Sequence, residues 1–341
     1  MNKCTTISID LAKNVYQVAL FNANGTLKSN KKMSRTRMLA FVAQHPGARI
    51  LMEACGSAHH WGRLFESRGY EVRLIPPHIA AKCRNGNKSD ANDTLAIYLA
   101  ASHPQVHFVS VRSNEQQDLA TLHRLRQGYM TQRTALANRI RGLAQEYGIW
   151  FPTGINPLRK QLLDVLEDGD NALTHAARFA IGDLHQQLLH LDVQIEKATK
   201  YLVDLTRQQP ICRELTKLPG VAWLGAGALF ARLGNGRAFK RGRDAAASLG
   251  LVPAHKGTGG NNRLLGITKR GDRYLRTLLV HGARSVVTNI RDKQDKLSCW
   301  IRTLLGKHHI NKAAVALANK VARIAWAMLT TGQPYQAPVA R

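Results

Sequence analysis

The feature that most constrains this fold is an apolar repeat in the middle of the chain. Apolar residues recur there at alternating spacings of four and three: Ala177, Ile181, Leu184, Leu188, Leu191, Ile195, Ala198, Leu202 and Leu205. Such spacing places side chains on one face of an α-helix, and a repeat of this length predicts a coiled coil or a long antiparallel helical hairpin. An ordinary long core helix is the alternative.

A less regular stripe precedes this repeat, at Leu122, Leu125, Tyr129, Leu136, Ile140, Leu143 and Tyr147. A loop rich in glycine and proline, residues 148–157, separates the two stripes. We therefore predict that residues 113–209 form a helical arm between two domains. The arm carries no cluster of catalytic residue types, so we expect it to act as a spacer or an assembly element.

The first 112 residues have strand-like patterning instead. Strands are predicted at 5–10, 15–21, 26–32, 50–53 and 71–75, and helices at 35–44 and 58–68. An antiparallel meander followed by strand–helix units is the order of a ribonuclease H-like α/β fold, although the apolar pattern alone fits other α/β folds. In this fold the first strand is central.

Four carboxylates stand out in this N-terminal part. Asp10 and Glu53 each end a predicted strand, while Asp90 and Asp93 begin a helix-like stretch. Carboxylates that converge raise each other's pKa unless a cation joins them, and Mg²⁺ prefers oxygen ligands. Lys and Arg outnumber Asp and Glu by 49 to 22, which indicates a polyanionic partner. Together these features predict metal-dependent chemistry on nucleic-acid phosphate, whereas purely structural binding would not require strand-end acids.

Residues 210–341 are predicted to form a third, mostly helical domain. Its segment 218–229 is typical of a helix-hairpin-helix element, in which the Pro219-Gly220 turn presents backbone N–H groups to a DNA phosphate. Residues 256–263 have the composition of a loop, and Gly259 and Gly260 would let backbone approach a phosphate closely. A basic DNA-contacting loop without catalysis is the alternative interpretation. Helices are predicted at 274–287 and 311–330.

The remaining composition favours an intracellular protein. The five cysteines are far apart and form no CxxC pair, which suits a reducing compartment and provides no zinc framework. We find neither a signal peptide nor an apolar run long enough for a membrane span. We therefore expect the protein in the cytoplasm, associated with the nucleoid and not with a membrane.

Several motifs, in order along nearly the whole chain, resemble those of the DEDD insertion-sequence transposases, a family that includes the Piv/MooV DNA invertases. The N-terminal motifs are Ser8-Ile9-Asp10, Glu53-Ala54-Cys55-Gly56 and Lys88-Ser89-Asp90-Ala91-Asn92-Asp93. The C-terminal motifs are the Pro-Gly turn, Gly250-Leu251-Val252-Pro253 and Ile267-Thr268-Lys269-Arg270-Gly271-Asp272.

The resemblance implies a RuvC-like domain (1–112), a coiled-coil arm (113–209) and a C-terminal transposase domain (210–341). It implies a recombinase in which Asp10, Glu53, Asp90 and Asp93 hold Mg²⁺. Such recombinases use a structured RNA from the element, which pairs with donor and target DNA. Their active sites are assembled across protomers, so a dimer or tetramer is implied.

The family nucleophile is a serine next to glycine, whereas this chain has Gly257-Thr258-Gly259-Gly260. Thr258 is therefore the predicted nucleophile, with a methyl group that restricts its approach. The residues predicted to contact nucleic acid are Lys88, Pro219, Gly220, Gly259, Gly260, Arg263, Lys269, Arg270, Arg273 and Arg276. Two other functions remain open: a metal-dependent junction nuclease that hydrolyses DNA with water, and a nucleic-acid-binding protein without catalysis.

Overall fold

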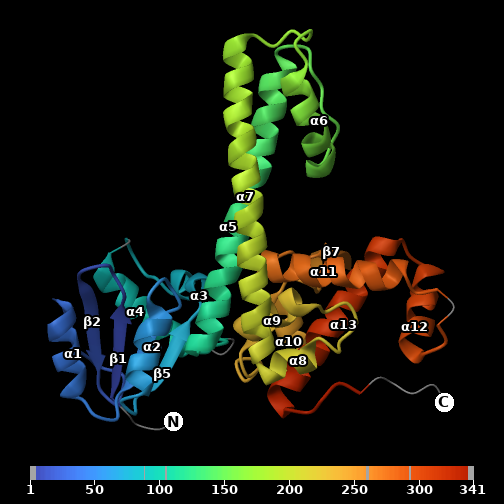
Figure 1. The fold of residues 1–341 in the computed structure, drawn as a ribbon. Coiled ribbons are helices and arrows are strands. Elements are labelled where there is room, and N and C mark those ends of the chain that lie inside the picture. Colours follow the sequence, from blue (N-terminus) through green and yellow to red (C-terminus); the bar gives the residue numbers. More distant parts are fainter. Residues whose placement is uncertain (1–4, 88, 104–105, 259–260, 292, 337–341) are drawn as a thin grey trace.

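The chain folds into an N-terminal α/β part, a long helical arm and a C-terminal helical part (Figure 1). The computed structural model describes residues 5–87, 89–103, 106–258, 261–291 and 293–336. The N-terminal and C-terminal parts lie on opposite sides of the base of the arm (Figure 1). Within the described residues, no helix is both long and apolar enough to cross a membrane.

The N-terminal part is built on a five-stranded sheet. Its strands are β1 (Thr6–Asp10), β2 (Tyr16–Phe21), β3 (Leu27–Met33), β4 (Arg49–Glu53) and β5 (Glu71–Ile75). They follow the order β3-β2-β1-β4-β5, with β1–β2 and β2–β3 antiparallel and β1–β4 and β4–β5 parallel. All five predicted strands are present within two residues of their expected limits, and β1 is central as expected.

Helices cover both faces of the sheet. On one face, α1 (Arg35–Ala43) and α2 (Ala58–Glu66) bury Met38 and Phe65 against strand residues such as Ile9. On the other face, α3 (Pro77–Lys82) and α4 (Asp90–Ala101) pack on Leu51. The sheet is therefore buried on both sides, which fixes the direction in which every strand residue points.

The arm consists of α5 (Asn114–Gln145) and α7 (His175–Gln208), which run antiparallel, with α6 (Ile155–Glu167) folded beside their far end (Figure 1). The regular apolar repeat is confirmed as a packing face, since Ile181, Leu188 and Leu202 are buried. The less regular stripe is partly wrong: Leu125 and Leu143 are 43% and 39% exposed. Leu119 and His123, which do not belong to this stripe, are buried instead.

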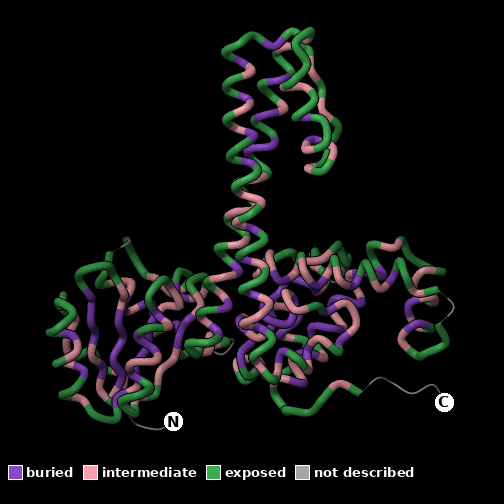
Figure 2. The backbone as a smooth tube through the Cα atoms, in the orientation of Figure 1, coloured by how far each residue is buried: buried purple, intermediate pink, exposed green. Residues whose placement is uncertain are grey.

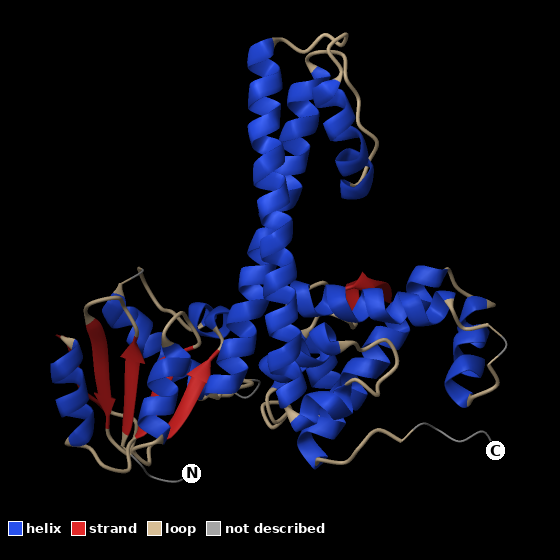
Figure 3. Cartoon of the chain, viewed as in Figure 1, coloured by secondary structure: helices blue, strands red, loops and turns tan. Residues whose placement is uncertain are grey.

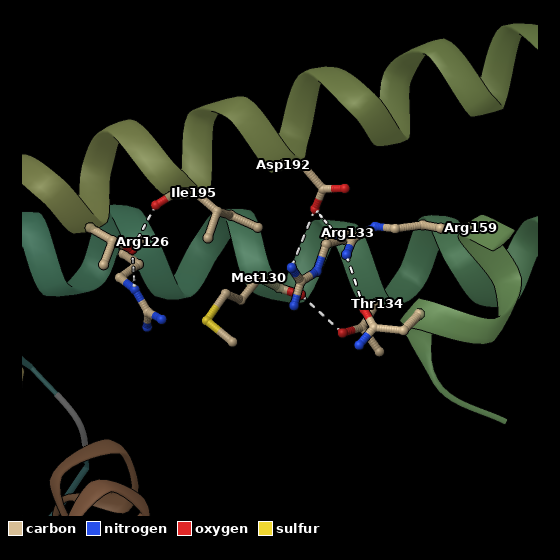
Figure 4. Close-up of polar contacts among 9 residues, drawn as sticks. Arg126, Met130, Arg133, Thr134, Arg159, Asp192 and Ile195 are labelled. Carbon is tan, nitrogen blue, oxygen red and sulfur yellow. Dashed lines mark hydrogen bonds and ion pairs between the residues drawn. The ribbon is translucent and has the colours of Figure 1, made fainter.

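Polar contacts join the three helices of the arm (Figure 4). Asp192 of α7 forms ion pairs with Arg133 of α5, at 3.3 Å, and with Arg159 of α6. Closer to the base, Arg126 donates from Nε to Thr199 Oγ1 at 2.8 Å. These bonds fix the register of α5 against α7 where the apolar stripe of α5 is imperfect.

The C-terminal part packs six helices around one apolar core. They are α8 (Pro210–Leu215), α9 (Trp223–Leu233), α10 (Gly242–Ser248), α11 (Arg273–Thr288), α12 (Lys296–Leu305) and α13 (Ile310–Thr331). Buried residues are concentrated in α9 and in α13 where α13 meets α11 (Figure 2). The helices predicted at 274–287 and 311–330 are confirmed as α11 and α13.

The segment predicted as a loop, residues 256–263, is different. It belongs to a two-stranded antiparallel hairpin of β6 (Pro253–Thr258) and β7 (Asn261–Ile267), shown in red beside α11 in Figure 3. The loop prediction is wrong because it was based on the glycine and asparagine content of this segment and did not consider that its two sides could pair as strands. Two short segments separated by a Gly-Gly pair can form a hairpin, which residue composition does not distinguish from an irregular loop.

Candidate functional site

The first pair of predicted site residues ends two neighbouring strands. Asp10 is the last residue of β1 and Glu53 the last of β4, and the parallel register places Ile9 opposite Met52, one residue earlier in each strand. Asp10 and Glu53 therefore lie at the same edge of the sheet. Both carboxylates also act on Cys55: burial mainly, and then the charges of Glu53 and Asp10, raise the pKa of its thiol.

Helix α4 places the second pair at this edge. Ser8, two residues before Asp10 and on the same face, donates from its buried Oγ to the Thr94 carbonyl at 2.8 Å. The Asn30 side chain of β3 donates to the Ala91 carbonyl at 3.1 Å. At the other end of α4, Tyr98 stacks on Phe21, which pairs with the first residue of β1. The N-terminus of α4 is thus directed toward the end of β1 that carries Asp10.

Both helix carboxylates are held by cations. Asp90 lies 3.0 Å from Lys32 Nζ, and Lys32 is in the same cross-strand row of the sheet as Asp10, through Gln17. Asp93 lies 2.6 Å from Arg84 Nε, in a half-buried ion pair. We call Asp10, Glu53, Asp90 and Asp93 together the carboxylate corner, because they occupy one end and one face of the sheet.

The donor set of this corner suits a hard divalent cation, since all four groups supply carboxylate oxygen. The four groups do not form a closed ligand shell here. Within the described ranges, no group of three or more His, Cys, Asp and Glu is arranged to hold a metal ion. Lys32 and Arg84 were not singled out from the sequence. Lys32 lies 58 residues before Asp90, and Arg84 lies 9 residues before Asp93. Neither spacing indicates an ion pair.

The second predicted centre is the β6–β7 hairpin. Thr258 is the last residue of β6 and pairs with Asn261, the first of β7. Arg263 is exposed on β7 opposite Lys256. Gly259, Gly260 and Lys88 lie outside the described residues. Thr258 therefore ends the first strand of a short two-stranded ribbon.

The base of the hairpin is fixed by close backbone packing. Gly250 and Gly271 have φ values of 69° and 92°, in the left-handed region. A Cβ at Gly271 would lie 1.9 Å from the Ser248 carbonyl oxygen, so no other residue fits there without a backbone shift. Between these glycines, Lys269 and Arg270 are exposed on the turn that precedes α11.

The remaining predicted contact residues differ in environment. Arg273 is exposed on the first turn of α11, whereas Arg276 donates from Nη1 to the Leu249 carbonyl at 2.8 Å and so stabilises the end of α10. Helices α8 and α9 flank the Pro219-Gly220 turn. A Cβ at Gly220 would lie 2.5 Å from the carbonyl oxygen of Gly282, so this turn packs directly on the backbone of α11.

The carboxylate corner and the hairpin are not brought together within one chain. The sheet lies on one side of the arm and the hairpin on the other side, beside α11 (Figure 3). The separation is already plain in projection.

Comparisons with known proteins cover both halves of this arrangement. A family model described as the IS116/IS110/IS902 transposase family matches residues 212–298. A transposase model of the DEDD IS110 type matches residues 7–149, which include all four carboxylates.

Two relatives are similar over almost their full length. The transposase for insertion sequence element IS1111A of Coxiella burnetii is 36% identical over 336 residues, covering 98% of this chain and 92% of the relative. The transposase for insertion sequence element IS1328 of Yersinia enterocolitica is 36% identical over 332 residues, covering 97% of this chain and 98% of the relative.

Proposed function

The chain belongs to the IS116/IS110/IS902 family of transposases, and from this premise we propose that it cuts and rejoins DNA strands for an insertion sequence through a composite active site. One half of this site is the carboxylate corner, and the other half is Thr258 on the hairpin of a second protomer. The observation that supports the proposal is that the five-stranded sheet and the β6–β7 hairpin lie on opposite sides of the arm (Figure 3).

The fold supports the first half. The strand order β3-β2-β1-β4-β5 is the one expected of a ribonuclease H-like, RuvC-like domain, with the central strand ending in Asp10. We further propose that α5 and α7 act as a coiled-coil arm in the oligomer. The α8–turn–α9 segment would act as a helix-hairpin-helix element on DNA, by the backbone N–H groups of its turn.

Asp10, Glu53, Asp90 and Asp93 are the residues that would hold Mg²⁺. When bound, the ion supplies Lewis-acid polarisation of the scissile phosphate and stabilises its developing charge. The chain itself prepares the corner: Ser8 and Asn30 anchor α4, and Lys32 and Arg84 neutralise the carboxylates of Asp90 and Asp93 until a metal ion replaces them. These two cations would also attract the phosphate backbone toward the corner.

In the second half, the Thr258 hydroxyl would attack phosphorus. A bond forms between Thr258 Oγ and phosphorus, the bond from phosphorus to one strand oxygen breaks, and the hydroxyl proton leaves with that oxygen or with solvent. The covalent link conserves the phosphodiester energy for rejoining. Arg263, Lys269 and Arg270 are exposed around the hairpin and its base, where they would bind flanking phosphates.

An element-encoded RNA would supply the sequence specificity, as the family resemblance implies. The net charge of +27 is consistent with binding more nucleic acid than one short duplex. RNA that copurifies with the protein can be sequenced. A discrete species from beside the coding region is expected, whereas bulk cellular RNA alone would contradict guidance by RNA.

The deciding experiment mixes two inactive variants. Asp10→Asn and Thr258→Ala should each reduce transposition by about 10³-fold or more, because each removes a group essential to the chemical step. If the two halves act across protomers, mixing the variants should restore a measurable fraction of activity, since some sites then combine an intact corner with an intact hairpin. Failure of the mixture to recover, with both variants folded and oligomeric, would contradict the composite site.

A trapped intermediate separates this proposal from a junction nuclease that uses water. The parent should leave a covalent protein–DNA adduct on a denaturing gel, and Thr258→Ser should retain it while Thr258→Ala loses it. Strand cleavage by Thr258→Ala at the parental rate, without an adduct, would favour the hydrolytic nuclease.

A further inference from the structure

A small arginine-lined pocket lies where the three parts of the chain meet, and its lining includes Asp272, which directly follows the Lys269-Arg270-Gly271 turn at the base of the hairpin. Its volume is about 250 Å³. Arg112 from the segment before α5, Arg124 from α5 and Arg232 from α9 line it, together with Asp272 and Tyr274 at the start of α11. We call this cavity the joint pocket. It is located at the base of the arm, where α5 passes α9 (Figure 1).

The positive charge of the joint pocket exceeds its negative charge. Asp272 is the single acid in its lining and already caps α11, accepting from the Leu275 N–H at 2.9 Å. The other oxygen of Asp272 is 3.8 Å from Arg232 Nε, a long ion pair. In the part of the chain that the structure describes, neither Arg112 nor Arg124 forms a side-chain hydrogen bond or ion pair.

The backbone around Arg112 holds it in this position. The Arg112 N–H donates to His59 Nδ1 at 3.2 Å, and Arg63 Nη1 donates to the Arg112 carbonyl at 2.9 Å. Both partners belong to α2 of the N-terminal part. Burial and the charges of Arg232 and Arg124 lower the pKa of Arg112, and burial with the nearby arginines lowers the pKa of His59 to about 4. The joint therefore concentrates unneutralised charge at a fixed place.

We propose that the joint pocket binds one backbone phosphate of a nucleic-acid strand and thereby fixes the N-terminal part against the arm and the C-terminal part. The inference rests on the proposed function, since the strand is nucleic acid on which the transposase acts. The three guanidinium groups come from three segments of the chain, and each can donate two parallel N–H hydrogen bonds to the oxygens of one phosphate. A phosphate would offset the mutual repulsion of Arg112, Arg124 and Arg232.

The size of the pocket favours a phosphate over a larger ligand. Pockets for drug-sized molecules and cofactors have volumes of about 300–1,000 Å³. The joint pocket is smaller and has three arginines in its lining. A backbone phosphate, whose sugar and base remain outside, fits this lining better than an entire nucleotide does.

The test uses the full-length protein with a random-sequence DNA duplex and a random-sequence single-stranded RNA as probes. Affinity is measured at several KCl concentrations for the parent, Arg124→Gln and Arg232→Gln. Arg124 is exposed and forms no side-chain bond within the described residues, so its replacement should leave the fold intact. Arg139→Gln, on the exposed face of the same helix and about 22 Å farther along, is the matched control.

One lost phosphate contact should weaken binding of at least one probe several-fold and reduce the slope of log K against log salt by about one. Arg139→Gln should keep the parental slope. The inference is overturned if Arg124→Gln and Arg232→Gln keep the parental slope for both probes, or change no more than Arg139→Gln does.

A second measurement identifies the source of the phosphate. Inorganic phosphate alone is added to the parent and to Arg124→Gln, and the thermal midpoint is followed. If it stabilises only the parent while both proteins bind the nucleic-acid probes equally, the pocket takes free phosphate and the proposal of a backbone phosphate is wrong. If the parent itself binds neither probe, the proposed function fails. If the parent supports transposition but the pocket variants keep the parental slope of log K against log salt, only the inference about the joint pocket is overturned.

Discussion

The carboxylate corner and the β6–β7 hairpin position their functional residues in different ways. In the corner, Asp10 and Glu53 extend from strands buried on both faces, and the buried Ser8 hydroxyl holds the helix that carries Asp93. The hairpin has only two strands, and its residues from Arg263 to Gly266 are exposed. Packing on both faces fixes the strands that end in Asp10 and Glu53, whereas only the base of the hairpin is fixed, by glycine backbone contacts.

This difference indicates a division of roles. Metal ligands must converge within a few tenths of an ångström, which a doubly covered sheet provides without a partner. A nucleophile that must reach a site on another molecule gains from an extended ribbon. An isolated two-stranded ribbon is marginally stable in water, so its final geometry depends on what it binds. Three substitutions test this contrast, and the first should change stability most.

Gly271→Ala should destabilise the C-terminal part by about 3 kcal/mol, because it combines a left-handed backbone with a Cβ 1.9 Å from the Ser248 carbonyl oxygen. The midpoint of urea unfolding measures this change. Gly266→Ala in β7 is the control, since its Cβ would meet nothing within 4 Å, and it should change stability by less than about 0.5 kcal/mol. Equal midpoints for the two variants would show that the base of the hairpin is not fixed.

Ser8→Ala should cost about 1–2 kcal/mol, because a buried hydrogen bond to the Thr94 carbonyl is lost. It should also loosen the first turn of α4 and increase hydrogen exchange at the amides of residues 93–96. The control is Ser67→Ala, whose exposed hydroxyl donates to the Leu64 carbonyl, and its effect should be near zero. Unchanged exchange in α4 would mean that the corner does not depend on Ser8 for its rigidity.

Arg84→Gln should change stability by less than about 1 kcal/mol, since ion pairs near the surface contribute little. Its main effect should be a lower Mg²⁺ concentration for half-maximal activity, because the Asp93 carboxylate loses a competing cation. A Mg²⁺ titration of strand cleavage measures this shift. Lys82→Gln, an exposed cation at the end of α3, should leave the midpoint unchanged. A higher Mg²⁺ requirement in Arg84→Gln would contradict the corner as a metal site.

Much of the fold followed from local patterns in the sequence. The strands ending at Asp10 and Glu53 were predicted correctly because apolar runs in a buried sheet are short and continuous, and turns bound them. The helix α7 was equally clear from its repeat. The stripe of α5 was less accurate, since Leu125 and Leu143 are exposed while His123 is buried. Polar residues can occupy a helix interface when they find partners, as His123 does with Tyr274 at 3.0 Å.

The site was predicted in part. Asp10 and Glu53 were expected to meet because adjacent strands end at one edge, and the register places them there. The ion pairs of Asp90 with Lys32 and of Asp93 with Arg84 were not predicted. They join side chains of different elements, and such contacts leave no repeating pattern in the sequence. The hairpin was mistaken for a loop, since glycine and asparagine are common to both.

The sequence by itself determined the acids at the strand ends, the long apolar face of α7 and the basic character of the chain. These properties depend on neighbouring residues and on total charge, which are local or additive. The packing of the folded chain places the β6–β7 hairpin across the arm from the sheet and brings Arg112, Arg124 and Arg232 into one pocket. Such proximity arises from how helices pack over long separations in the chain, and residues far apart in sequence give no local signal of it.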